Sequence, residues 1–182
     1  MSQEQSVPEY DFPTPATPTD SFVLVREFNE AFGVRIADQP CLPGMTEGLK
    51  NELYRLRLLL GEQARYWHVV CSAYNNSPVA MRMHLMLEEL GEVVEAVLKE
   101  DMINLLKEFN DQRIVNDGSV QVFGLESLFH AAMQLTHKAN MSKLVNGKPV
   151  KNAVGRIQKG PNYKPADLSP LFAAFAAEGK KT

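Results

Sequence analysis

Apolar residues recur every three or four positions along most of this chain, which is the period of one face of an α-helix. The pattern predicts five helices, at about residues 21–33, 46–73, 78–99, 101–123 and 126–142. Almost no stretch alternates between apolar and polar residues, so strands are not expected. The sequence therefore predicts an all-α fold, a bundle of four to five helices.

Capping and turn residues mark the ends of these helices. Residues that suit the N-cap position are Ser21, Thr46 and Ser77. Gly33 and Gly124 suit the position just after a helix, where the backbone often turns left-handed. These residues agree with the boundaries that the apolar period indicates.

The third and fourth helices each have a predicted apolar stripe. On the third, the stripe is Met83, Leu87, Leu90, Val94 and Val97. On the fourth, it is Met102, Leu105, Leu106 and Phe109. We expect these stripes to face the core and the acidic residues of both helices to project on the opposite side.

The 182 residues are enough for one domain with a sizeable core, which we place at residues 20–168. Residues 1–19 contain four prolines among polar residues and are predicted to be an extended or disordered arm. Within the domain, residues 138–164 form a basic C-terminal segment, and residues 169–182 are expected to be a tail.

Composition points to a soluble cytoplasmic protein. The two cysteines provide no disulfide framework. The N-terminus is polar and acidic, unlike a signal peptide, and no run approaches the roughly 18 to 20 apolar residues of a membrane helix. A net charge of −3 gives no reason to expect nucleic-acid binding, so neither a membrane nor a nucleic acid is an expected partner.

Charge is divided unevenly along the chain. Residues 88–111 contain eight acidic and two basic residues, a local net charge of −6. Residues 138–164 contain seven basic residues and no acidic ones. An anionic helix pair followed by a cationic segment suits a ligand that is both metal-bound and phosphorylated.

The acidic residues are spaced for one face of each helix: Glu88, Glu89 and Glu92 on the third, and Glu108 and Asp111 on the fourth. A solvated acidic face is the simple alternative for either helix alone. Two such faces on consecutive helices favour a divalent-cation site. Carboxylates without clustered histidine or cysteine select a hard ion, Mg²⁺ or Mn²⁺.

Four runs of the sequence, within residues 78–168, resemble the all-alpha nucleoside triphosphate pyrophosphatases. This superfamily includes the MazG-like, dimeric dUTPase-like and phosphoribosyl-ATP pyrophosphohydrolase-like enzymes. The four runs are RMHLMLEELGEVVEA, EFNDQRIVNDGSVQVFGL, KANMSK and KGPNYKPADL. The family hallmark, E-E-x-x-E on one helix and E-x-x-D on the next, matches Glu88, Glu89, Glu92, Glu108 and Asp111.

The resemblance implies Mg²⁺-dependent hydrolysis between the α- and β-phosphates of a nucleotide, giving a monophosphate and pyrophosphate. By this resemblance, the residues that hold Mg²⁺, or Mn²⁺ as a substitute, are Glu89, Glu92, Glu108 and Asp111. Glu88 would position or deprotonate the attacking water.

The resemblance also implies residues for the substrate. Asn140 and Lys143 match the Asn-x-x-Lys of the family, in which the lysine would contact phosphate. Lys159 and Tyr163 could close over the nucleotide, and Asp117 could read its ribose or base.

Base recognition stays open, because Gln112 and Arg113 follow the E-x-x-D where relatives have apolar and often aromatic residues. Removal of dUTP, dCTP or a modified nucleotide from the nucleotide pool is the leading reading. The alternatives are a biosynthetic enzyme like phosphoribosyl-ATP pyrophosphohydrolase, and a non-enzymatic helical module whose acidic face binds a partner protein. The resemblance implies a homodimer or homotetramer.

Overall fold

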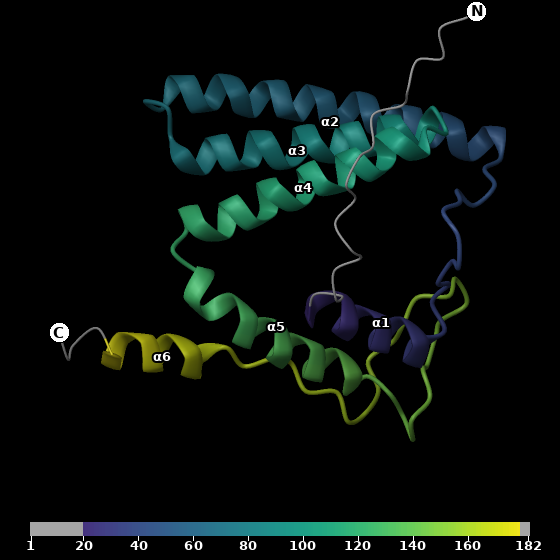
Figure 1. The fold of residues 1–182 in the computed structure, drawn as a ribbon, viewed down its shortest axis with the longest axis vertical. Helices are drawn as coiled ribbons and strands as arrows, with labels where there is room; N and C mark the ends of the chain where they lie inside the picture. The colour runs from purple at the N-terminus through teal and green to yellow at the C-terminus, as the bar shows by residue number, and fades with distance from the viewer. Residues whose placement is uncertain (1–19, 179–182) are drawn as a thin grey trace, which may run out of the picture. The chain divides into compact units, whose positions relative to one another are not determined.

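Six helices make up most of residues 20–178, the part of the chain that the computed structural model describes (Figure 1). They are α1 (Asp20–Phe32), α2 (Glu47–Ala73), α3 (Pro78–Leu98), α4 (Met102–Val122), α5 (Glu126–Met141) and α6 (Ser169–Glu178). Within residues 20–178, extended pairing is limited to the isolated bridges Val145–Lys148 and Lys151–Ile157. The all-α fold is confirmed, and the predicted arm at residues 1–19 lies outside the described residues.

Most predicted helix ends agree with the structure. The Thr46 hydroxyl accepts a hydrogen bond from the Leu49 amide at 3.2 Å, and the Ser77 hydroxyl accepts one from Ala80 at 3.4 Å. Gly33 and Gly124 follow α1 and α4 with φ of 59° and 68°, in the left-handed region that favours glycine.

The N-cap predicted at Ser21 is wrong, because α1 already begins at Asp20 and Ser21 lies in its first turn. An acidic residue is itself favourable at the positive end of a helix, so the sequence also permits this earlier start.

The helix α6 was not predicted, since residues 169–182 read as a tail. Its sequence, SPLFAAFAAE, is apolar on all sides and has no polar face to reveal a helical period. Alanine has a high helix propensity, however, and the Asp167 carboxylate accepts a hydrogen bond from the Ser169 amide at 3.0 Å. Hydrogen bonds from the side chain and then the backbone of Ser169 hold the pKa of Asp167 below its usual value.

The described residues form two compact units. Unit 1 comprises residues 20–36 and 133–170, and unit 2 comprises residues 37–132 and 171–178. Each is considered on its own, and the single domain at residues 20–168 stays a prediction. Among residues 20–178, the helices are too short or too polar to cross a membrane.

Unit 2 is built on α3, which packs against α2 on one side and α4 on the other (Figure 1). The core between α3 and α4 consists of Val93, Ala96 and Leu105, with three partly buried residues around them. Two of these core residues, Val93 and Ala96, are small side chains that α3 contributes.

The apolar stripe predicted for α4 is only partly correct. Leu105 is buried, but the side chains of Leu106 and Phe109 are 67% and 53% exposed. The residue that shares the buried face with Leu105 is Glu108, which is 3% exposed. The prediction that Glu108 and Asp111 project away from the core-facing side is therefore wrong for Glu108. Apolar residues on several sides of α4, such as the 87% exposed Ile103, leave the hydrophobic period unable to select one face.

The apolar stripe predicted for α3 needs a smaller correction than that of α4. Val94 is buried as predicted, whereas Leu90 is 38% exposed. The remaining buried positions on this helix belong to small residues and valines: Ala80, Gly91, Val93 and Ala96.

Candidate metal centre

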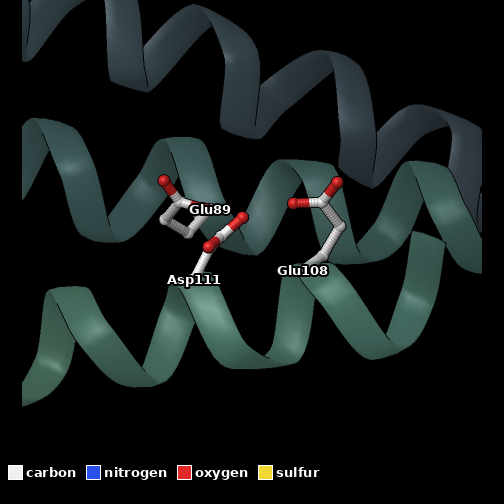
Figure 2. A group of neighbouring side chains, drawn as sticks. All are labelled: Glu89, Glu108 and Asp111. Atoms are coloured by element: carbon white, nitrogen blue, oxygen red, sulfur yellow. The ribbon is translucent and has the colours of Figure 1, made fainter. Parts of the chain in front are cut away.

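Three carboxylates point into the space between α3 and α4: Glu89 of α3, and Glu108 and Asp111 of α4 (Figure 2). One oxygen from each residue can be chosen so that all three lie within 4.8 Å of one another. Oxygen ligands on opposite sides of a bound Mg²⁺ are about 4 Å apart, so a small contraction would let all three bind one ion.

The short turn between the helices explains this convergence. Asp101 caps α4 by accepting a hydrogen bond from the Asn104 amide at 3.0 Å. Glu89 and Asp111 are each eleven residues from Glu100, at the centre of the turn. Because the two helices run antiparallel, residues equally far from the turn lie opposite each other.

The same symmetry pairs Glu92 with Glu108, since each is eight residues from Glu100. Their carboxyl groups lie within hydrogen-bonding reach of each other. The structure thus brings together four of the carboxylates that the sequence singled out. They form what we call the acidic cluster: Glu89, Glu92, Glu108 and Asp111.

Burial makes this arrangement costly in the absence of a cation. The Glu108 side chain is 4% exposed. The Oε2 atom of Glu89 is buried and has no hydrogen-bond partner among the described residues. A buried carboxylate oxygen without a donor is destabilising unless it is protonated or binds a cation, so the residues present fit a metal ion.

The pKa values of two of these acids reflect the same cost. Burial raises the pKa of Glu89 above its usual value, and the nearby charges of Asp111 and Glu108 raise it further. Burial also raises the pKa of Glu92, and its hydrogen bond with Glu108 raises it further. A divalent cation would favour the charged forms of both acids.

One cation of the chain itself already contacts the cluster. The Lys107 ammonium donates to both Glu108 oxygens at 3.1 Å and to the Asp111 carboxylate at 2.7 Å. Hydrogen bonds to Asp111 and Glu108 raise the pKa of Lys107 well above its usual value. Sequence reasoning missed this residue, although its position four residues before Asp111 was the available signal.

Glu88 lies at the margin of the cluster. Its side chain is exposed, and its Oε2 atom is 3.7 Å from Nε2 of His84, one helical turn earlier. The other ring nitrogen of His84 lies 3.0 Å from the Ala64 carbonyl oxygen, so it carries the proton and donates. The predicted role of Glu88 toward water stays a prediction.

Asp117, further along α4, is exposed, and its carboxylate lies 3.5 Å from Nε of Arg113. Arg113 therefore forms an ion pair within its own helix. The contribution of Asp117 to ribose or base recognition is still a prediction.

The other four predicted substrate residues gather within unit 1. Lys143 donates a hydrogen bond to the Asn140 side-chain oxygen at 2.7 Å. The Lys159 ammonium lies 4.7 Å from the centre of the Tyr163 ring, and that of Lys143 lies 6.0 Å from it. We call this group the cationic cluster.

Close packing of the loop fixes the cationic cluster. A Cβ atom at Gly160 would lie 2.5 Å from Val145 and 3.1 Å from the Lys143 carbonyl oxygen, so only glycine fits there. The Lys164 amide donates to the Ser142 hydroxyl at 2.9 Å. These contacts hold residues 159–164 against the segment that follows α5.

Comparison of the chain with protein-family models, curated proteins and solved structures found no match. A function is therefore inferred from the residues of the two clusters and from the family resemblance in the sequence.

Proposed function

We propose that this protein is a Mg²⁺-dependent nucleoside triphosphate pyrophosphohydrolase, which forms a nucleoside monophosphate and pyrophosphate. The observation that carries the proposal is the convergence of Glu89, Glu108 and Asp111, with a buried and unpartnered Glu89 oxygen among them. The family motif in the sequence supports the same reaction.

The residues that would hold the metal are the four of the acidic cluster. A divalent ion bound there would supply charge neutralisation for the phosphates and a lower pKa for a bound water. Glu88, exposed beside the cluster, accepts the proton of the attacking water in this proposal. The water oxygen forms a new bond to one of the two phosphorus atoms, and the bond from that phosphorus to the oxygen bridging the α- and β-phosphates breaks. The products leave as the nucleoside monophosphate and pyrophosphate.

The cationic cluster is suited to phosphate. Lys143 and Lys159 can each donate to phosphate oxygens, and the Tyr163 ring offers a flat surface for an aromatic group. A homodimer or homotetramer in the cytoplasm completes the proposal, on the strength of the family resemblance.

A nucleotide panel with Mg²⁺ tests the reaction. Phosphate should be detected only when inorganic pyrophosphatase is added, because pyrophosphate is the direct product. The Asp111→Asn variant should be inactive, whereas Glu52→Gln, in an exposed carboxylate paired with Arg55 on α2, should keep wild-type activity. Direct release of orthophosphate, or no turnover of any nucleotide, would refute the proposal.

One observation favours a second candidate, a helical module that binds a partner protein. α4 exposes Ile103, Leu106 and Phe109, and such apolar surface often marks an interaction site. This candidate predicts that Mg²⁺ leaves the stability of the protein unchanged, so a metal-dependent increase would exclude it as a full account.

A further inference from the structure

A cleft with a volume of about 440 Å³ lies between α2 and α3 in unit 2. The lining residues that matter chemically are Tyr54, Arg57, Arg65, Glu95, Leu98 and Lys99. Its volume is within the range of about 300 to 1,000 Å³ that is usual for small-molecule sites. It belongs to the α2 side of α3, whereas the acidic cluster lies toward α4.

Positive charge dominates this cleft. Arg57 donates from Nε and Nη2 to Oε2 of Glu95 at 3.0 and 2.8 Å, and Lys99 donates to the other oxygen at 2.6 Å. Glu95 is thus shared by two cations. Arg65 has no hydrogen bond or ion pair to any of residues 20–178, so the cleft has two positive charges in excess.

Two glycines leave room for the arginine side chains. A Cβ atom at Gly61 would lie 3.0 Å from Nη1 of Arg57 and 3.5 Å from Nη1 of Arg65. A Cβ atom at Gly91 would lie 3.2 Å from the same Arg57 nitrogen. Glycine inside a helix is less favourable than alanine. At Gly61, however, the missing side chain leaves space for the guanidinium groups of Arg57 and Arg65. Arg57 already pairs with Glu95, so the guanidinium of Arg65 is the one beside it that can bind an added anion.

We propose that this cleft binds an organic phosphate, a phosphate monoester with an aromatic or apolar group. The guanidinium of Arg65 and the ammonium of Lys99 would contact the phosphate, since a planar guanidinium matches phosphate oxygens in pairs. Tyr54 and Leu98 would contact the organic group. The proposal does not depend on the pyrophosphohydrolase activity.

Calorimetric titration with phenyl phosphate tests this site. It is done in EDTA and in a Lys143→Gln, Lys159→Gln background, so that neither the acidic cluster with a metal nor the cationic cluster contributes. Saturable binding is expected, and Arg65→Gln should weaken it about tenfold, the effect of losing a charge-assisted hydrogen bond. The matched control is Arg55→Gln, on the same helix but outside the cleft and paired with Glu52. It should leave the affinity within about twofold.

A second variant, Gly61→Ala, adds a methyl group where the two guanidinium groups lie, and should also weaken binding. Binding that is unchanged by both Arg65→Gln and Gly61→Ala would overturn the proposal. So would benzoate binding as tightly as phenyl phosphate, because the site would then select a carboxylate. Inorganic phosphate should bind more weakly than phenyl phosphate, and equal affinity would refute the contact with Tyr54 and Leu98. If the wild-type protein with Mg²⁺ hydrolyses no nucleotide but phenyl phosphate still binds, this site stands and only the proposed activity is refuted.

Discussion

Two glutamates of α3, three residues apart, have pKa values shifted in opposite directions. Glu92 faces α4, where burial and the hydrogen bond to Glu108 raise its pKa. Glu95 faces α2, where hydrogen bonds from Lys99 and Arg57 lower its pKa. A glutamate of α3 is therefore favoured in its protonated form on the side that faces α4 and in its charged form on the side that faces α2.

The difference follows from the opposite balance of charge at the two interfaces of α3. Between α2 and α3, one carboxylate meets two cations, so the negative charge of Glu95 is fully compensated and positive charge is in excess. Between α3 and α4, four carboxyl groups meet the single ammonium of Lys107. Among the described residues, the acidic cluster thus has negative charge in excess, and a divalent ion would compensate it.

The largest expected effect is on catalysis. Glu108→Gln removes a charged oxygen at the most buried position of the acidic cluster, so nucleotide hydrolysis should fall on the order of 100-fold or more. Steady-state rates at saturating Mg²⁺ measure this, with Glu52→Gln as the control on α2. Wild-type rates in Glu108→Gln would remove this residue from the metal centre.

The next effect concerns the internal cation. Lys107→Gln removes an ammonium that contacts Glu108 and Asp111, so a divalent ion would no longer compete with it. Mn²⁺ affinity, measured by calorimetry, should increase several-fold. Lys99→Gln removes a lysine of the same helix pair that contacts Glu95 instead, and should change Mn²⁺ affinity little. Equal affinities in wild type and Lys107→Gln would mean that Lys107 does not compete with the metal.

Glu89→Gln should stabilise the metal-free protein by about 1 kcal/mol at pH 7, because it removes a buried charge without a partner. Burial raises the folded-state pKa of Glu89 above its ordinary value. As the pH rises above that value, the unfolded state releases its proton before the folded state does, so the wild type loses stability. Urea unfolding from pH 4 to 8 should therefore show an advantage of the variant that grows with pH. A constant difference would contradict this account.

The smallest effect is expected at Glu95, and its sign is opposite. Its lowered pKa means that the charged form stabilises the folded state above the unfolded value and that this contribution disappears as the pH falls through the folded value. Glu95→Gln should cost up to about 1 kcal/mol at pH 7, since the side chain is 38% exposed and its ion pairs are screened. A stabilising substitution at Glu95 would remove the contrast with Glu89.

Much of the fold was predictable from the sequence. The apolar period indicated α1 to α5, and the hydroxyls of Thr46 and Ser77 indicated two helix starts. The helix α6 was missed because an apolar, alanine-rich decapeptide has no polar face.

The candidate site was predictable in its residues but not in its geometry. The acidic spacing singled out the members of the cluster, and their equal distances from Glu100 would have paired Glu89 with Asp111. The burial of Glu108 could not be predicted, because α4 carries apolar residues on several of its faces. Only its packing against α3 determines which face is buried. Lys107 was overlooked because a lysine in an acidic segment resembles an ordinary surface residue.

Thermal unfolding with and without Mg²⁺ tests the central claim most directly. At a concentration of about 100 times the dissociation constant, a bound metal should add about 2.7 kcal/mol of stability, or roughly 5 to 10 °C in the unfolding midpoint. Asp111→Asn, which removes one carboxylate of the acidic cluster, should lose most of that increase. An unchanged midpoint in the wild type at all Mg²⁺ and Mn²⁺ concentrations, or an equal increase in Asp111→Asn, would contradict a metal centre between α3 and α4.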